Sequence, residues 1–294
     1  MLDLRRLRLL RELARRGTIT AVAEALSYSP SAVSQQLAAL QKEAGVRLLE
    51  PAGRRVRLTG QASLLVTHAD VLLEDMERAE AALAQSLNET AGTLRVAAFQ
   101  TAILTLLPPA LTQLAEQHPR LRVEVTELEP EEALPALIAG EFDIILGEEY
   151  PGHPLPRPRE TERQDLLTDE LRLITPAAWT ERSLPELASR PFAMEPAGTT
   201  ARQWATGVCR QAGFEPDDRY TTTDLQIHLR LVESGLAAAL LPDLSGARDH
   251  HDVVEYRLPG RPQRQIFTTI RRGAARHPTI GAFTTALKAQ ETQP

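Results

Sequence analysis

The sequence predicts an α/β fold in three parts: a small helical head with a β-hairpin wing, a long linker helix, and a two-lobed body. Charge is the first observation behind this prediction. Residues 1–60 hold eleven Arg and Lys against five Asp and Glu, a net +6, whereas the whole chain carries −6 and the remainder therefore about −12. The second is a helix-turn-helix spacing within the same sixty residues. The third is an alternation of strand and helix patterns over residues 92–294, which is typical of α/β lobes.

Composition fits an ordinary globular protein of about two domains. Apolar runs such as 235–242 are too short to span a bilayer, and no secretory segment is visible at the N-terminus. We therefore expect a cytoplasmic protein without a membrane partner. Cys209 is the only cysteine, so an intramolecular disulfide is impossible. We interpret it as a small buried helix residue, and the alternative is a thiol sensor acting between subunits.

Three short helices are expected in the head. Residues 4–14 place leucines on one side, and the arginines that face the other way are Arg5, Arg8, Arg11 and Arg15. Gly17 ends this helix, and Thr18 or Thr20 caps the next one, at 21–26. A third helix runs from Pro30 or Ser31 to Ala44, because Ser29 is suited to the N-cap and Pro30 to the first turn.

The third helix has the chemistry of a DNA recognition helix. Its first turns present Ser and Gln, neutral donors and acceptors suited to base edges in the major groove. A wing follows, with strands at 46–49 and 54–58 around a turn at 51–53, and its arginines can meet phosphates. The alternative is a solvated basic hairpin beside merely exposed polar residues. We predict these DNA contacts: Thr18, Ser29, Ser31, Ser34, Gln35, Gln36, Arg54, Arg55 and Arg57.

The run TITAVAEALSYSPSAVSQQLAALQKEAGVRLLEPAGRRVRLT closely resembles the DNA-binding domain of LysR-type transcriptional regulators, and the match covers residues 2–60. Two departures stand out. Gln41 replaces the usual Glu, and Leu49-Glu50-Pro51 replaces the commoner Phe-Glu-Arg, which moves a phosphate contact toward Arg54 or Arg55. The resemblance implies a regulator whose paired heads bind an inverted repeat in double-stranded DNA, with RNA polymerase as a further partner at the promoter.

A linker helix is expected from Gln61 to Asn88, where Gly and Pro are absent. Apolar residues recur at alternating spacings of three and four, which indicates pairing with another helix. The alternative is packing on its own domain. We predict that the dimer seam includes Leu65, Leu72, Met76 and Leu83. Residues 90–92 then form a hinge, and the resemblance implies a homodimer or, preferably, a homotetramer.

The body reads as two α/β lobes. The order strand 94–99, helix 101–118, strand 121–128, helix 130–140 and strand 142–146 predicts a parallel sheet. Further strands are expected at 166–175, 192–195 and 237–241, with helices at 199–212 and 225–234. The phrases AGTLRVAAF, FDIILG and VESGLAAALLP resemble LysR landmarks, which implies a periplasmic-binding-protein-like (type 2) effector domain.

Three domains follow from this organisation. We place the winged helix-turn-helix at 1–60, the linker helix and hinge at 61–91, and the effector-binding domain at 92–294. Within the last, lobe I takes about 92–163 and 265–294, because the strand at 265–270 and the helix at 278–289 have no partner nearby in sequence. Lobe II then takes about 164–264.

Ligands of such sheets bind beyond the carboxyl ends of strands, at helix N-termini. We expect a small-molecule effector there, an amino acid or an organic acid. The predicted contacts are Phe99, Gln100, Thr101, Glu148, Gly198, Thr199, Thr200, Arg202, Thr222 and Thr223. Glu148 and Glu149 either face the cleft and pair with an ammonium or are solvated loop charges.

No catalytic motif is legible in the sequence, neither GxSxG nor HExxH nor a Walker glycine run. We interpret the Asp and His residues at 249–252 as loop residues. We therefore expect no enzyme activity, no cofactor and no bound metal. The rival interpretations are a solute receptor, which leaves the cationic head unexplained, and an enzyme with an appended DNA-binding head.

Overall fold

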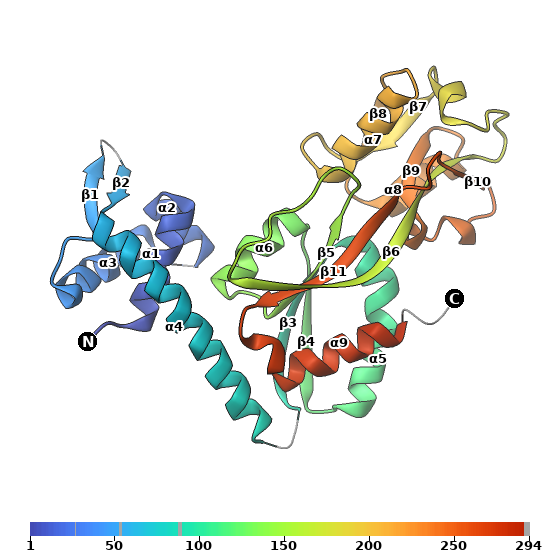
Figure 1. Cartoon of the computed structure of the whole chain (residues 1–294). Coiled ribbons are helices and arrows are strands. Elements are labelled where there is room, and N and C mark those ends of the chain that lie inside the picture. Colours follow the sequence, from blue (N-terminus) through green and yellow to red (C-terminus); the bar gives the residue numbers. More distant parts are fainter. Residues whose placement is uncertain (27, 53–54, 88–89, 291–294) are drawn as a thin grey trace.

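The computed structural model describes residues 1–26, 28–52, 55–87 and 90–290. It has a helical head, a long oblique helix and a two-lobed body along the chain (Figure 1). Within these residues no helix is both long and apolar enough to cross a membrane.

The head consists of α1 (Leu4–Arg16), α2 (Ile19–Ala25), α3 (Pro30–Ala44) and the strands β1 (Leu49–Ala52) and β2 (Arg55–Leu58). Side-chain caps start all three helices: Asp3 for α1, Thr18 for α2 and Ser29 for α3. Gly17 and Gly45 end α1 and α3 with positive φ, as a left-handed C-cap requires. The apolar stripes of the helices meet in one buried core, which includes Leu7, Leu10, Leu13, Val22, Val33, Leu37 and Leu40.

The wing is displaced from its predicted position. Its first strand covers 49–52 instead of 46–49, so Pro51 and Ala52, which we expected in the turn, lie within the strand. The reason is Gln41, whose side-chain oxygen accepts the backbone N–H of Leu48 at 2.9 Å and of Leu49 at 3.1 Å. These bonds hold the preceding segment against α3. An edge strand tolerates Pro51, which lacks an N–H, and a Glu side chain could accept the same two bonds as Gln41.

The linker helix α4 (Gly60–Gln85) divides into two halves. In the first half Ala62, Ala69 and the partly buried Leu65 pack on the head's own core, as the alternative interpretation of the seam expects. In the second half Leu72, Met76 and Leu83 are 43%, 41% and 68% exposed. Three residues of the predicted dimer seam are therefore exposed, while Leu65 packs in the core of the head.

The body contains β3 (Gly92–Ala98), a π-helical turn (Ala102–Leu106), α5 (Leu107–Gln117), β4 (Leu121–Glu127), α6 (Pro130–Ala139), β5 (Ile144–Glu149), β6 (Thr161–Pro176), β7 (Pro191–Met194), α7 (Thr200–Gln211), β8 (Asp217–Thr221), α8 (Leu225–Glu233), β9 (Ala238–Pro242), β10 (Val253–Arg257), β11 (Gln263–Arg271) and α9 (Pro278–Gln290). Short 3₁₀ turns lie at 184–187, 243–245, 247–249 and 274–276. In the described residues the strands of the body form one sheet in the order β4-β3-β5-β11-β6-β9-β7-β8, with β10 beside β6.

Both ends of this sheet are parallel, and its middle is antiparallel. β3 pairs in parallel with β4 and β5, as predicted, and β7 pairs in parallel with β8 and β9. β11 returns from the end of the chain to pair antiparallel with both β5 and β6. The long strands β6 and β11 therefore run between the two lobes (Figure 1).

Several strands differ from the predicted ones. β8 and β10 were missed: β8 is largely polar, whereas β10 is short and shows its apolar alternation only over Val254–Leu258. β6 begins at Thr161 instead of residue 166. β5 covers 144–149 instead of 142–146, so Glu148 and Glu149 belong to a strand and not to a solvated loop. Glu148 is only 9% exposed, and Glu149 pairs with Arg163.

Candidate functional site

The outer face of α3 is polar and open. Ser31, Ser34 and Gln35 are exposed near the N-terminus of the helix, while Val33 and Leu37 of the opposite face are buried in the head core. This alternation follows from the 3.6-residue repeat, which turns one stripe inward and leaves the other free. A helix presented in this way can enter a major groove with its first two turns.

Other predicted DNA contacts are partly engaged within the protein. The side-chain oxygen of Gln36 accepts a hydrogen bond from Nε of Arg6 at 2.9 Å, which turns this residue toward α1. Ser29 caps α3 and contacts the hydroxyl of Ser31 at 3.0 Å. Thr18 likewise caps α2. On the wing, Arg57 forms an exposed pair with Glu50 at 3.0 Å. Arg54 and the side chain of Arg55 lie outside the described part of the structure.

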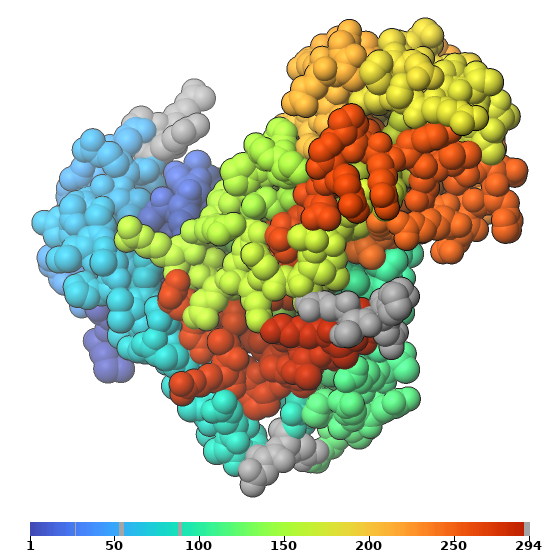
Figure 2. Space-filling view, turned by 45° about the vertical axis from the view of Figure 1, so that its right-hand side comes forward, coloured from blue at the N-terminus to red at the C-terminus, as the bar shows by residue number. Residues whose placement is uncertain are grey.

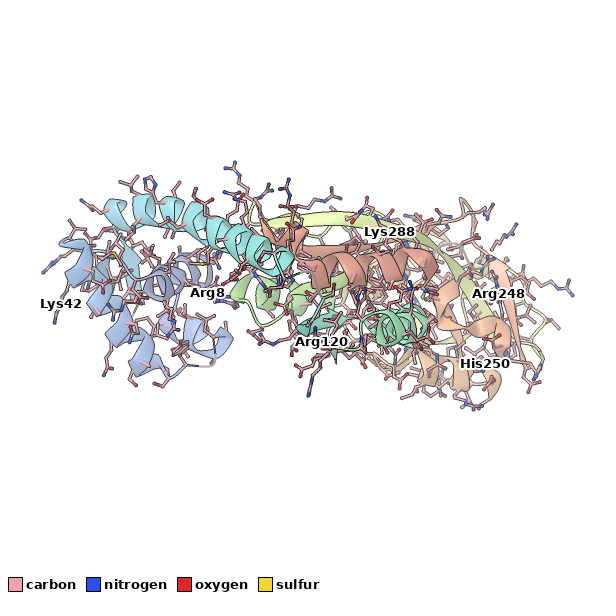
Figure 3. All side chains as sticks on the ribbon, turned by 90° about the horizontal axis from the view of Figure 1, so that it is seen from below. Arg8, Lys42, Arg120, Arg248, His250 and Lys288 are labelled. Atoms are coloured by element: carbon pink, nitrogen blue, oxygen red, sulfur yellow. The ribbon has the colours of Figure 1, made fainter. Side chains whose placement is uncertain are left out.

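Two arginines on the outward face of α1 are covered by the body. Arg11 is only 6% exposed, and its guanidinium donates to the carbonyl oxygen of Ile138, near the end of α6, at 3.0 Å. Arg8 donates to the carbonyl oxygen of Ala139 beside it. Figure 3 shows Arg8 between the head and the first lobe. The sequence pattern marks these residues as polar, but it carries no signal for the second domain that covers them.

This contact joins the head to the C-terminal end of α6. Arg16 donates to the carbonyl oxygen of Pro135 at 3.2 Å, and Arg15 pairs with Glu160. The last carbonyl groups of a helix lack partners within the helix and carry partial negative charge, so cations stabilise that end. Figure 2 shows the head lying directly against the first lobe. A shift of α6 would therefore change its contacts with the arginines of the head.

A cavity of about 330 Å³ lies between the two lobes. Its walls come from the N-terminal end of α6, the end of β5, and the segment between β7 and α7. The lining consists of Glu129, Pro130, Glu131, Glu132, Glu148, Tyr150, Glu195, Pro196, Ala197, Gly198, Thr199, Thr200, Ala201 and Thr223. Sheet strands end here and helices begin, which is the position expected for a ligand in an α/β fold.

Half of the predicted effector contacts line this cavity, and half do not. The lining ones are Glu148, Gly198, Thr199, Thr200 and Thr223. The others lie elsewhere: Phe99 is buried in the core of lobe I, Gln100 and Thr222 bond to groups around Asp224, Thr101 bonds to Arg264, and Arg202 pairs with Asp218. Arg202 is thus engaged outside the cavity.

Arg264 forms a buried charge network below the cavity. Its guanidinium, 1% exposed, pairs with Asp169 at 2.7 Å and with Glu148, and it donates to the hydroxyl of Thr101 at 2.7 Å. Burial alone lowers the pKa of Arg264, but the carboxyl groups of Glu148 and Asp169 outweigh burial and raise it. Arg264 therefore stays charged and holds strands β5, β6 and β11 together.

Two further carboxyl groups of the cavity favour their protonated forms. Burial, reinforced by the charge of Glu148, raises the pKa of Glu129 to about 8 and that of Glu195 to about 7. Sequence reasoning missed both residues. A signal existed for Glu129: it follows the second parallel strand at the same edge as the segments chosen after the first and third. For Glu195 the signal was its position at the end of the strand predicted at 192–195, before the helix at 199–212 whose start was predicted to contact the ligand.

Two direct contacts bridge the lobes around the cavity. The hydroxyl of Thr200, at the start of α7, donates to Glu131 of α6. The amide of Gln100, after β3, donates to Asp224 at 2.9 Å and accepts from the backbone N–H of Leu225 at 2.9 Å. Polar groups therefore already connect the two lobes, one pair at the cavity and the other around Asp224. Larger hollows of about 780 and 610 Å³ lie beside α4, and one of about 690 Å³ lies on the other side of Pro130 and α6.

The fold and these sites define a class: a DNA-binding transcription regulator with a winged helix-turn-helix and a separate two-lobed ligand-binding domain. Residues 4–63 match the family "Bacterial regulatory helix-turn-helix protein, lysR family", and residues 87–292 match "LysR substrate binding domain". The chain therefore belongs to the LysR family of transcriptional regulators.

Relatives extend over nearly the whole chain. A probable HTH-type transcriptional regulator LrrA of Synechococcus elongatus is 29% identical, with 98% of this chain and 97% of that protein covered. A probable hydrogen peroxide-inducible genes activator of Mycobacterium avium is also 29% identical, with 90% and 86% covered. The solved structure of a full-length OxyR variant from Pseudomonas aeruginosa is similar in fold, with a TM-score of 0.64, 20% identity, and 98% and 95% covered.

Proposed function

We propose that this regulator binds an inverted repeat in promoter DNA as a homodimer or homotetramer and responds to a small-molecule effector in the interlobe cavity. The exposed polar face at the start of α3 carries the DNA part of the proposal. Paired heads suit a DNA site with two-fold symmetry, and the exposed apolar side chains Leu72, Met76 and Leu83 offer a surface for pairing. Acting at promoters, the protein would work in the cytoplasm beside RNA polymerase.

The helix α6 offers a route from the cavity to the head. Its first turn carries Glu131 and Glu132, which line the cavity, and its last turn receives Arg8 and Arg11 of the head. A ligand that pulls on the first turn changes the position of the last, since a short helix moves largely as a rigid body. Effector binding and DNA binding are then two ligand equilibria coupled through one element.

A peroxide response, which the name of the Mycobacterium avium relative suggests, is not part of this proposal. In this chain it would depend on Cys209, the single cysteine. That thiol is buried in the core of lobe II beside Trp204, and burial raises its pKa to about 12. Because the thiolate is the form that peroxide oxidises, we propose that the cavity senses the signal.

Capture of genomic DNA tests the proposal. Purified full-length protein is incubated with sheared DNA of the source genome at about 0.15 M salt, where nonspecific phosphate binding is weakened, and the retained fragments are sequenced. We expect enrichment of a few promoter fragments that share a two-fold symmetric sequence. Retained fragments with the same composition as the input would contradict the proposal.

A further inference from the structure

The cavity between the lobes is lined by acidic side chains. Five glutamates line it, and among the residues described around it no Lys, Arg or His does. Three of them lie together at the start of α6, with Glu129 at the N-cap and Glu131 and Glu132 in the first turn, whereas Glu148 lies in β5 and Glu195 follows β7. Three separate segments of the chain therefore bring carboxyl groups to one cavity.

Two arginines that adjoin residues of the cavity are already engaged. Arg264 is 1% exposed and is held by Glu148, Asp169 and Thr101. Arg202, which follows the cavity segment in α7, pairs with Asp218 on β8. An anionic ligand in the cavity would thus face several carboxylates and no available guanidinium or ammonium.

Glu129 is a partly buried glutamate of the cavity. Among the described side chains none donates a hydrogen bond or an ion pair to its carboxyl group, and partial burial beside other carboxyl groups raises its pKa. An ionised carboxylate in such surroundings is costly unless a cation or hydrogen-bond donors reach it. The same holds in part for Glu195, whose pKa burial also raises. The cavity thus has acceptors in excess of donors.

We propose that the cavity binds a small organic cation, an aliphatic amine or a guanidine, as the effector of this regulator. The proposal rests on the function proposed above for the interlobe cavity. An ammonium carries three donors and a guanidinium five, and neither has an acceptor, which complements carboxylates and the hydroxyl groups of Thr199 and Thr200. The cavity volume of about 330 Å³ is at the lower end of the range for ligand pockets, so the ligand must be small.

A metal ion fits the same charge less well. Among the described residues no group of three or more Asp, Glu, His or Cys side chains is arranged so that it could hold a metal ion. The carboxylates surround an open volume, whereas a hard cation such as Ca²⁺ needs six to eight oxygens at about 2.4 Å. An organic cation can place its charge near one wall and its carbon chain along another.

Calorimetric titration with a matched set of four-carbon molecules tests the charge of the ligand. We would titrate the full-length protein at about pH 8.5, above the pKa of Glu129, with 1,4-diaminobutane and with 4-aminobutylguanidine. The comparison ligands are succinate and 1,4-butanediol, which have the same carbon chain with negative or no charge. We expect saturable binding of at least one cation, one per chain, and no heat from succinate or the diol.

Variants locate the binding. Glu129→Gln and Glu195→Gln keep the shape of the side chain and remove the charge, so each should weaken cation binding by roughly tenfold or more. Glu116→Gln, on the exposed surface of α5, is the matched control and should change the affinity by less than about twofold. Circular dichroism of each variant establishes that it is folded.

The inference is overturned by any of three results. One is the absence of heat from both cations up to about 10 mM, far above ordinary effector concentrations. Another is binding of succinate or of Ca²⁺ in their place. The third is cation binding that neither Gln variant weakens.

The DNA-capture experiment contains no added ligand. Its result therefore tests the proposed DNA-binding function independently of the proposed cation binding. Enriched promoter fragments without cation binding would support the proposed DNA-binding function and contradict the proposal of a cationic effector. Cation binding that depends on Glu129, without any DNA preference, would support the cationic ligand and contradict the proposed DNA-binding function.

Discussion

Arg264 is the side chain on which most of the cavity floor depends. It satisfies Glu148, Asp169 and Thr101 at once, from a position that water does not reach. Buried ion pairs add little net stability compared with apolar residues of the same shape, but removal of one partner leaves the others as uncompensated charges. The network therefore makes the arrangement of the strands specific.

Replacement of Arg264 tests this role. We expect Arg264→Met to lower the free energy of unfolding by about 3–5 kcal/mol, because two buried carboxylates lose their cation. Arg219→Met removes an exposed pair with Asp217 and should cost less than about 1 kcal/mol. Urea unfolding followed by circular dichroism measures both. Equal losses in the two variants would show that the network contributes no more than a surface pair.

Glu129 gives the stability of the protein a definite dependence on pH. Its pKa is about 8 in the folded chain and 4.5 as the ordinary value. Between these values the unfolded chain binds fewer protons than the folded one, so the contribution of this group to stability is full below about pH 4.5 and is lost as the pH rises to 8.

A substitution separates this effect from others. Glu129→Gln should raise the free energy of unfolding by about 1–3 kcal/mol at pH 8.5 and change it little at pH 5, since the amide never ionises. Thermal unfolding at both pH values measures the difference, with Glu116→Gln as the control. The same gain at both pH values would argue against a shifted pKa.

At the scale of elements, α3 presents two neighbouring glutamines in different states. Gln35 is exposed, whereas Gln36 accepts a hydrogen bond from Arg6. A Gln side chain free at the groove can bond to adenine, and loss of such a pair costs about 1–3 kcal/mol of discrimination.

We therefore expect Gln35→Ala to relax base preference at one position of each half-site. Gln36→Ala should have the smaller effect on preference. Selection of binding sites from random duplexes, followed by sequencing, compares the two variants with the parent. A preference changed by Gln36→Ala and untouched by Gln35→Ala would reverse the assignment.

Local signals predicted the elements of the head well. The end of α1 at Gly17 and the bounds of α3 depend on a few adjacent residues, and Ser29, Pro30 and Gly45 suffice to place α3. The wing shifted because the side chain of Gln41 reaches it from eight residues away. The cavity was predicted only in part: Glu129 and Glu195 each follow a strand, but their approach to Glu148 depends on contacts between segments far apart in sequence.

Across the whole molecule, α6 links two sites that the sequence treats separately. Its N-terminal end lines the cavity, and its C-terminal end accepts the arginines of α1. Arg271 adds the linker helix to this junction, because it contacts both the carbonyl oxygen of Leu137 and the side chain of Glu77. Coupling between distant sites in proteins is typically 1–3 kcal/mol, or about 5–150-fold in affinity.

Loss of the head contact should remove this coupling. We expect Arg11→Ala to bring the effector-induced change in operator affinity from that range to about onefold, while effector binding itself stays intact. Arg5→Ala, on the exposed side of the same helix, should keep the ratio even if it weakens binding to DNA phosphates. Operator titrations with and without effector give the ratio, and an unchanged ratio in Arg11→Ala would exclude this route.

The claim that underlies the rest is that paired heads recognise a symmetric DNA sequence. Fluorescence anisotropy tests it most directly, with the full-length protein, a duplex that carries the captured site, and a duplex in which one half-site is scrambled. At about 0.15 M salt we predict at least a hundredfold weaker binding to the scrambled duplex, because several base pairs at about 1–3 kcal/mol each are lost. Equal affinity for the two duplexes would contradict the account.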